Sequence, residues 1–186
     1  MDQNSEITML LNSMADGETS SFDELVPLVY DEMQHMARRQ LGGQGSGATL
    51  NTNALVHEAF LKLSAGQEQG IRNRDQFLRV CSVVMRNVVI DAVRRRHAGK
   101  RGGPLGTLTF NEELFETENQ AEELIALDEA LIRLEDYDPM LARVVECRYF
   151  AGLTDLETGG ALTISERTVR RHWSKARTLL HQMLTS

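Results

Sequence analysis

The stretch from Leu153 to Trp173 constrains the fold of this chain more than any other, because it predicts two short helices that cross at a tight turn. Ser165 is expected to cap the second helix, since its hydroxyl can accept a hydrogen bond from an amide two or three residues later. The small core shared by the two helices is predicted to contain Leu156, Leu162, Ile164, Val169 and Trp173. The outward face of the second helix carries Arg167, Arg170, Arg171 and Lys175. This layout is typical of a helix-turn-helix, whose second helix enters the DNA major groove.

Apolar residues at helical spacing predict helices through most of the remaining chain, with no convincing strand and no internal repeat. The first long helix is predicted to begin at Ser21, with Glu24 completing a capping box, and to run to Leu41. Further helices are expected at about Thr52–Leu63, Asp75–Arg96, Ala121–Leu134 and Met140–Phe150. The predicted fold class is therefore all-α, with two small helical domains joined by a flexible linker. The predicted boundaries are 1–20 for an N-terminal extension, 21–101 for the first domain, 102–120 for the linker and 121–186 for the second domain.

The charge of the chain is segregated along the sequence. The net charge of −7 argues superficially against nucleic acid, because phosphate repels an acidic protein. From Arg72 to Arg101, however, only Asp75 and Asp91 oppose a basic run. From Glu112 to Glu146 the pattern reverses, and two arginines stand within a dense acidic run. This asymmetry is more informative than the sum.

Several other classes of protein are excluded. Cys81 and Cys147 are isolated, so buried free thiols in a reducing cytoplasm are expected. No apolar run reaches the roughly 18 residues of a membrane span, and the amino terminus lacks a basic signal-peptide start, so the predicted location is cytoplasmic. The His57-Glu58 pair has Leu61 where a zinc-binding motif needs its second histidine. The Gly-rich run 42–47 follows a helix and lacks Gly-Lys-Ser/Thr, so a connector is favoured over a phosphate loop. We expect no enzymatic activity, no metal and no cofactor.

The combined motifs resemble a bacterial extracytoplasmic-function (ECF) sigma factor of the sigma-70 family over nearly the whole chain. Leu55-Val56-His57-Glu58-Ala59-Phe60-Leu61-Lys62-Leu63 looks like the family's region 2.2, and Phe77–Arg101, with Asp91-Ala92-Val93-Arg94-Arg95-Arg96, looks like regions 2.3 and 2.4. The helix-turn-helix is similar to region 4. The resemblance implies that the protein binds core RNA polymerase and directs transcription initiation by recognising the −10 and −35 elements of promoter DNA. The polymerase-binding residues that it implies are Leu55, Val56, Glu58, Ala59, Phe60 and Leu63.

The resemblance also assigns residues to each promoter element. For the −10 element they are Arg72, Asn73, Arg74, Arg79, Arg86, Asn87, Arg94, Arg95 and Arg96; a solvated helix face is the alternative for each arginine. For the −35 element Ser165, Glu166, Arg167, Thr168 and Arg171 are expected to read bases, while Arg170, Lys175 and Arg177 contact phosphate. Trp173 is expected in the core, with base stacking as the alternative.

The chain departs from the family pattern at two places. Asn51-Thr52-Asn53-Ala54 stands where acidic residues are usual, which resembles a subgroup associated with serine/threonine kinases. A phosphate on Thr52 would add nearly two negative charges at a helix N-terminus; the alternative is that Thr52 or Asn53 is simply an N-cap. In the helix-turn-helix, Gly159 and Gly160 lie inside a predicted helix, each costing about 1 kcal/mol, and Thr163 replaces a turn glycine.

A stand-alone helix-turn-helix regulator is the competing functional class. Such a protein needs a receiver or ligand-binding domain beside its DNA-binding domain. Residues 21–101 show neither the strand–helix alternation nor the acidic pocket of a receiver. The sigma-factor hypothesis is therefore favoured. Binding to core polymerase distinguishes the two hypotheses, because only a sigma factor is expected to form a stoichiometric complex with it.

Overall fold

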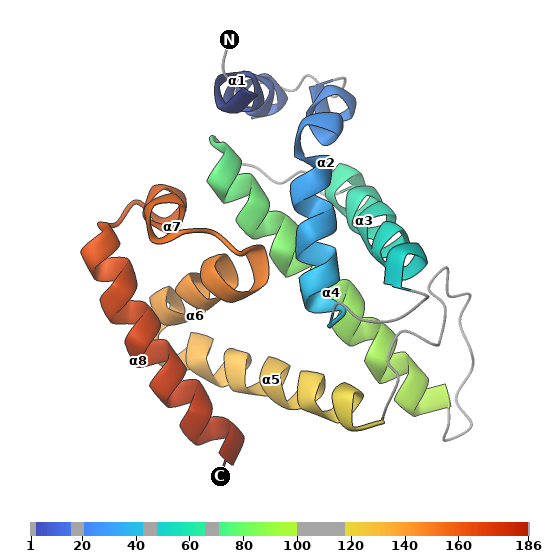
Figure 1. Cartoon of the computed structure of the whole chain (residues 1–186), viewed down its shortest axis with the longest axis vertical. Helices are drawn as coiled ribbons and strands as arrows, with labels where there is room; N and C mark the ends of the chain where they lie inside the picture. Colours follow the sequence, from blue (N-terminus) through green and yellow to red (C-terminus); the bar gives the residue numbers. More distant parts are fainter. Residues whose placement is uncertain (1–2, 16–20, 43–47, 66–70, 100–117, 186) are drawn as a thin grey trace.

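The computed structural model describes residues 3–15, 21–42, 48–65, 71–99 and 118–185 (Figure 1), and structural statements below refer to these residues. Every regular element in them is a helix, which confirms the predicted all-α fold class. The elements are α1 (Gln3–Ala15), α2 (Ser21–Gln40), α3 (Ala48–Ala65), α4 (Arg74–Gly99), α5 (Glu118–Tyr137), α6 (Pro139–Val145), the π-helix η2 (Glu146–Ala151), α7 (Asp155–Leu162) and α8 (Glu166–Thr185). Most of the predicted linker and residues 43–47 of the Gly-rich connector fall outside these ranges.

Helices α1–α4, called the amino-terminal half below, surround the larger of two hydrophobic cores. The helices α2, α3 and α4 each contribute an apolar stripe at helical spacing, including Leu25, Leu55 and Phe77. Residues 3–15, for which the sequence predicted no element, form a helix that adds Ile7 and Leu11 to this core. The burial of these apolar side chains is the main stabilising contribution to such a bundle.

Helices α5–α8, called the carboxy-terminal half, enclose a second core built from α5, α6, η2 and α8, with Leu134 and Leu141 fully buried. The break expected between the helices predicted at Ala121–Leu134 and Met140–Phe150 is confirmed, since α5 ends at Tyr137 and α6 begins at Pro139. Asp138 caps α6, because its side chain accepts a hydrogen bond from the amide of Met140, and Pro139 occupies the first turn. A proline is tolerated there because a backbone N–H at the first helical position would have no acceptor within the helix.

The helix predicted at Met140–Phe150 is continuous, but its second part is the π-helix η2. The wider turn ends at Gly152, whose backbone is left-handed with φ +74°. A side chain at this glycine would collide with the guanidinium of Arg39, whose Nη1 donates to the carbonyl of Tyr149 at 3.5 Å. The end of α2 therefore packs directly on the end of η2.

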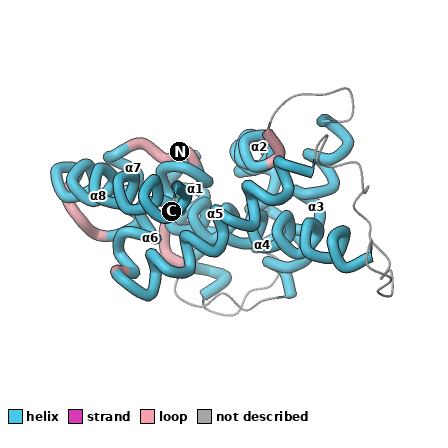
Figure 2. The backbone as a smooth tube through the Cα atoms, turned by 90° about the horizontal axis from the view of Figure 1, so that it is seen from below, coloured by secondary structure: helices cyan, strands magenta, loops and turns pink. Residues whose placement is uncertain are grey.

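The two halves are not separate bodies, because the larger core extends from one into the other. Cys147, Leu153 and Ala161 of the carboxy-terminal half are buried in the same cluster as residues of α2 and α4. Figures 1 and 2 show α4 in the middle, with α3 on one side and α7 and α8 on the other. No described helix has the length and apolar character needed to cross a membrane.

One predicted boundary is wrong. Helix α3 begins at Ala48, whereas the sequence analysis placed its start near Thr52. No glycine or proline interrupts residues 48–51, so the helix begins directly after Gly47. Thr52 and Asn53 therefore lie within the helix, and the alternative that one of them is its N-cap is also wrong.

Candidate nucleic-acid interface

The predicted helix-turn-helix is formed by α7, a three-residue turn and α8. Thr154 and Glu157 make a reciprocal capping box at the start of α7. The amide of Thr168 donates to the hydroxyl of Ser165 at 3.3 Å, which confirms the predicted cap of α8. The second helix therefore begins at a fixed point, and its first turns face outward.

The cationic side chains predicted to face outward from α8 do so. Arg167, Arg170, Arg171 and Lys175 are all exposed, as are Ser165 and Glu166, while Thr168 is partly buried. Arg170 forms exposed ion pairs with Asp155 at 3.7 Å and with Glu166 at 3.6 Å. Exposed pairs of this kind contribute little energy, so phosphate can displace them readily.

Close contact between α7 and the turn depends on Gly159. A β-carbon at this position would lie 2.7 Å from the backbone oxygen of Ile164. The carbonyl of Gly159 accepts hydrogen bonds from the amides of Thr163 and Ile164. Thr163 occupies the left-handed region with φ 58°, a conformation that a β-branched residue rarely adopts. The turn therefore keeps the usual geometry, and the residue that replaces the expected glycine is strained.

The prediction that Leu156 lies in the small core is wrong, because its side chain is 69% exposed. The buried side of α7 is formed by Thr158, Gly159 and Ala161. Leu156 precedes Thr158 by two residues and therefore points roughly 200° away around the helix axis. Val169 is fully buried, as predicted.

Trp173 packs against the second core, which agrees with the core interpretation, but the buried residues of this core come from α5, α6, η2 and α8 and not from α7 as predicted. Its ring is partly buried and lies close to two guanidinium groups, with Arg148 at 6.0 Å and Arg177 at 5.9 Å from the ring centroid. Cation–π contacts of this kind help to hold the ring in place. The indole is thus positioned as a packing residue.

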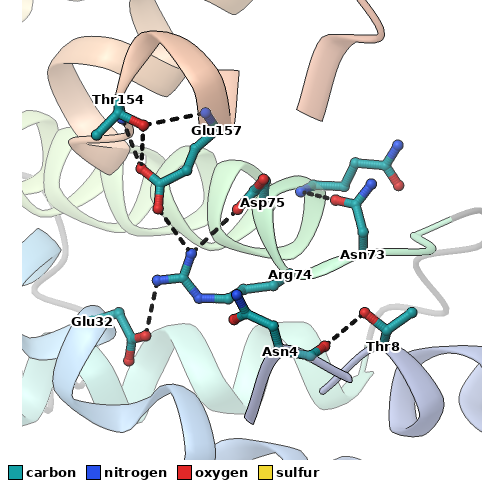
Figure 3. Close-up of polar contacts among 9 residues, drawn as sticks. Asn4, Thr8, Glu32, Asn73, Arg74, Asp75, Thr154 and Glu157 are labelled. Carbon is teal, nitrogen blue, oxygen red and sulfur yellow. Dashed lines mark hydrogen bonds and ion pairs between the residues drawn. The ribbon is translucent and has the colours of Figure 1, made fainter. Parts of the chain in front are cut away.

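Arg74 stands at the centre of a cluster that joins three helices (Figure 3). Its guanidinium contacts Glu32 of α2 at 3.0 Å, Asp75 at 3.2 Å and Glu157 of α7 at 3.2 Å. Burial opposes its charge, but the hydrogen bonds to Glu32 and Glu157 raise the pKa of Arg74. One predicted DNA-contacting arginine is therefore held by carboxylates from both halves.

The two acids beside Arg74 respond to the cluster in opposite ways. Burial, with the nearby charge of Glu157, raises the pKa of Asp75 despite its contact with Arg74. Burial also opposes ionisation of Glu157, but hydrogen bonds from Thr154 and from Arg74 hold the pKa of Glu157 below its usual value. Glu157 is thus the firmly ionised partner of Arg74.

Three further arginines of α4 pair with acids of the carboxy-terminal half. Arg79 contacts Glu146 of η2 at 2.9 Å, and Arg94 contacts Asp128 of α5 at 3.1 Å. Arg86 lies between these two carboxylates, 3.8 Å from Asp128 and 3.9 Å from Glu146. Both acids are buried. The solvated helix face weighed for each arginine does not describe Arg74, Arg79 or Arg86, whose side chains are mostly covered.

The remaining −10 candidates occupy different surroundings. Asn73 caps α4, because its side-chain oxygen accepts from the amide of Gln76 at 2.9 Å. Arg72, Asn87 and Arg95 are exposed, and the backbone of Arg96 lies in α4 while its side chain is outside the described atoms. The sequence did not anticipate the role of Glu146, Asp128 and Glu157. The alternation of a basic run with an acidic run was a sequence signal for Asp128 and Glu146, whereas Glu157 lies outside the acidic run.

The helix α3 presents a different surface from the one implied by the resemblance. Leu55, Val56, Ala59 and Leu63 are buried in the larger core, whereas Glu58 and Phe60 are partly exposed. The outward side of α3 carries the exposed residues His57, Leu61 and Lys62. The four buried residues therefore lie beneath the surface of α3 and not on it.

Thr52 is 1% exposed and lies in the second turn of α3. The neighbouring Asn53 accepts a hydrogen bond from Gln34 of α2 at 3.0 Å. Both predicted free thiols, Cys81 and Cys147, are buried. Within the described residues no group of histidine, cysteine and acidic side chains is arranged to hold a metal ion.

Comparison with known protein families gives a match over nearly the whole chain. The model of the family described as "ECF sigma factor" matches residues 4–186. The match includes all eight α-helices except the first residue of α1, so it covers both the α4 arginines and the helix-turn-helix. A search of curated proteins returns no match.

Proposed function

The chain belongs to the ECF sigma factor family, and from this premise we propose which of its surfaces carry each part of promoter recognition. A member of this family is a sigma factor, not an enzyme: it binds core RNA polymerase and directs it to promoter DNA. The surfaces proposed below are α8 for the −35 element, α4 for the −10 element and α3 for polymerase. We also propose that residues 21–101 and 121–186 are the two units that act on these targets.

The exposed arginines at the start of α8 carry the −35 proposal. A helix that begins at a fixed cap and presents Arg167, Arg170 and Arg171 outward fits the major groove. Arg167 and Arg171, with Ser165, Glu166 and Thr168, are proposed to read base edges. The remaining cations of this face, Arg170 and Lys175, are proposed to contact phosphate.

The row of arginines along α4 carries the −10 proposal. Arg74, Arg79, Arg86 and Arg94 are proposed to contact the DNA backbone once their present partners are displaced, and Arg72, Arg95 and Arg96 extend the row. Asn87 is exposed and is proposed to hydrogen-bond a base edge. Asn73 supports the start of this helix through its capping contact.

For polymerase we propose a surface centred on the outward side of α3, with Glu58 and Phe60 as contacts and Leu55, Val56, Ala59 and Leu63 as the packed support beneath them. Leu61 is a large apolar side chain exposed on this side. Apolar groups on a polar surface are frequent in protein interfaces.

The experiment that tests this assignment is in vitro transcription with core polymerase on a promoter selected by the wild-type protein. Arg171→Ala should lower promoter-dependent initiation by about 5- to 150-fold, because a base-reading arginine contributes about 1–3 kcal/mol. Arg133→Ala, which removes an exposed arginine of α5, is the matched control and should leave initiation unchanged. Equal loss in both variants would contradict the role of α8.

For regulation we propose that Thr52 is phosphorylated by a serine/threonine kinase, as in the kinase-linked subgroup that residues 51–54 resemble. A phosphate would supply the negative charge that this segment lacks. Because Thr52 is buried, the first turns of α3 must leave their packing before a kinase can reach the hydroxyl.

The test compares Thr52→Ala with Asn53→Ala, an adjacent exposed position, for promoter activity in cells and for phosphate incorporation. Thr52→Ala should lose both promoter activity and phosphate incorporation, and Asn53→Ala should retain both. Full promoter activity of Thr52→Ala in cells would refute phosphorylation as the switch.

A further inference from the structure

The interface between the two halves combines an apolar contact with a row of ion pairs. Cys147, Leu153 and Ala161 of the carboxy-terminal half are buried against the amino-terminal half. Beside this contact, the guanidinium of Arg86 lies 5.4 Å from the ring centroid of Phe150. Both halves would therefore expose apolar surface to water if they separated, and this favours the closed arrangement.

The acids at this interface contact the same arginines of α4 that are proposed to contact DNA phosphates. Glu157, Glu146 and Asp128 contact arginines at the beginning, middle and end of α4. A guanidinium binds carboxylate and phosphate through the same planar fork of donors. A phosphate backbone and these carboxylates therefore compete for the same arginines.

The closed arrangement does not cover every functional surface equally. Helix α3 packs on α2 and α4, and the elements η2, α7 and α5 pack on the other side of α4. Figures 1 and 2 both show α3 at the opposite end of the molecule from α8. Helix α3, in which His57 and Leu61 are exposed, lies on the opposite side of α4 from α7 and α8 (Figure 1).

We propose that the free protein is held closed by this interface, with the acidic residues of the carboxy-terminal half occupying the −10 DNA site on α4. Polymerase docks first on α3, which stays accessible, and separation of the halves then releases the arginines of α4. This proposal rests on the proposed role of α4 as the −10 contact. It explains how an arginine-rich helix is kept from binding DNA in the absence of polymerase, since affinity falls with the fraction of open molecules.

The variant Asp128→Asn/Glu146→Gln tests the proposal, because it removes both charges that face Arg79, Arg86 and Arg94 while keeping similar shapes. Glu129→Gln/Glu135→Gln is the matched control, since it changes the net charge equally at two exposed positions of α5. Two quantities are measured on the full chain. One is the radius of gyration from small-angle X-ray scattering, and the other is affinity for a fluorescent single-stranded DNA of mixed sequence.

The wild type and the control should have a radius of gyration of about 16 Å, the value for one compact body of this length. The Asp128→Asn/Glu146→Gln variant should be larger by several Å and should bind the DNA at least about tenfold more tightly than the control. Transcription with polymerase should be unchanged in both variants. An unchanged radius and unchanged DNA affinity would overturn the closed state proposed here, and expansion without tighter DNA binding would overturn the masking of α4.

A second variant covers the case in which the double variant loses its helical circular dichroism signal. Glu157→Gln keeps the capping contact with Thr154, because glutamine also serves at this position of a capping box, and it removes the charge that faces Arg74. It should show a smaller shift in the same direction in both measurements, and no shift would overturn the proposal. Failure of the −10 assignment itself would appear separately, as unchanged transcription by Arg86→Ala holoenzyme.

Discussion

Replacing Gly159 by alanine tests how tightly α7 is fitted against the turn that precedes α8. In an ordinary helix this substitution stabilises by about 1 kcal/mol, because glycine is a poor helix former. Here the new β-carbon would lie 2.7 Å from the backbone oxygen of Ile164, which is closer than non-bonded contact allows. The atom that it meets is backbone and cannot rotate away as a side chain can.

The turn cannot relax without a loss of hydrogen bonding, because the amide of Ile164 donates to the carbonyl of Gly159 at 3.1 Å. Overpacking of this kind costs about 1–3 kcal/mol, and a weakened buried hydrogen bond costs about 1 kcal/mol more. After subtraction of the gain in helix propensity, Gly159→Ala should destabilise the protein by about 1–3 kcal/mol. For a chain of this length the melting temperature should fall by about 2–12 °C.

Gly160→Ala is the matched control, since it adds the same methyl group to the next residue of the same helix. Its nearest neighbour would be the side-chain oxygen Oδ2 of Asp75 at 3.1 Å, a group that can shift by a few tenths of an ångström. The melting temperature of this variant should equal or slightly exceed that of the wild type. Thermal unfolding followed by circular dichroism measures both, and a Gly159→Ala variant as stable as Gly160→Ala would refute the reasoning.

Three further predictions follow from strain, charge and packing. Thr163→Gly should raise the unfolding free energy by about 1 kcal/mol in urea titration, because it relieves a left-handed β-branched residue; a loss of stability would contradict this. The folded-state pKa of Glu157 is lowered, so its stabilising effect is present above the unfolded pKa and is lost as pH falls through the folded pKa; Glu157→Gln should flatten the acid side of the stability profile. The folded-state pKa of Asp75 is raised, so its stabilising contribution is present at low pH and is lost as pH rises through the folded pKa. Asp75→Asn should therefore steepen the acid side of the stability profile, and identical profiles for the two variants would contradict both assignments. Leu134→Ala, at a fully buried position, should cost about 2–5 kcal/mol in the same titration, and a cost below about 1 kcal/mol would show that the second core is loosely packed.

Local signals in the sequence predicted most of the helices and the cap of α8. Ser165 caps α8 as expected, and the break before Pro139 was correct, because each depends on residues within one turn of the chain. The burial of Leu156 was predicted wrongly, since the apolar pattern of a helix as short as α7 does not fix which face turns inward. The start of α3 was placed too late because no strong capping residue marks Ala48.

The partners of the α4 arginines could not be predicted in the same way. Arg79 and Glu146 are 67 residues apart, and no local rule relates positions separated by that distance. The basic and acidic runs showed only that charge is segregated along the chain, and they did not show which acid faces which arginine. That pairing depends on the way the π-helix presents Glu146 and on the approach of α7 to α4.

The buried thiol of Cys147 allows the closed interface to be followed by thiol alkylation. Burial raises the pKa of Cys147 to about 12, so roughly one molecule in ten thousand carries the reactive thiolate at pH 8. Cys81 is equally buried but belongs to α4 of the amino-terminal half, so it serves as the internal reference thiol. The rate of alkylation of Cys147 relative to that of Cys81 therefore reports how often the halves separate, and it can be measured without DNA, promoter or polymerase.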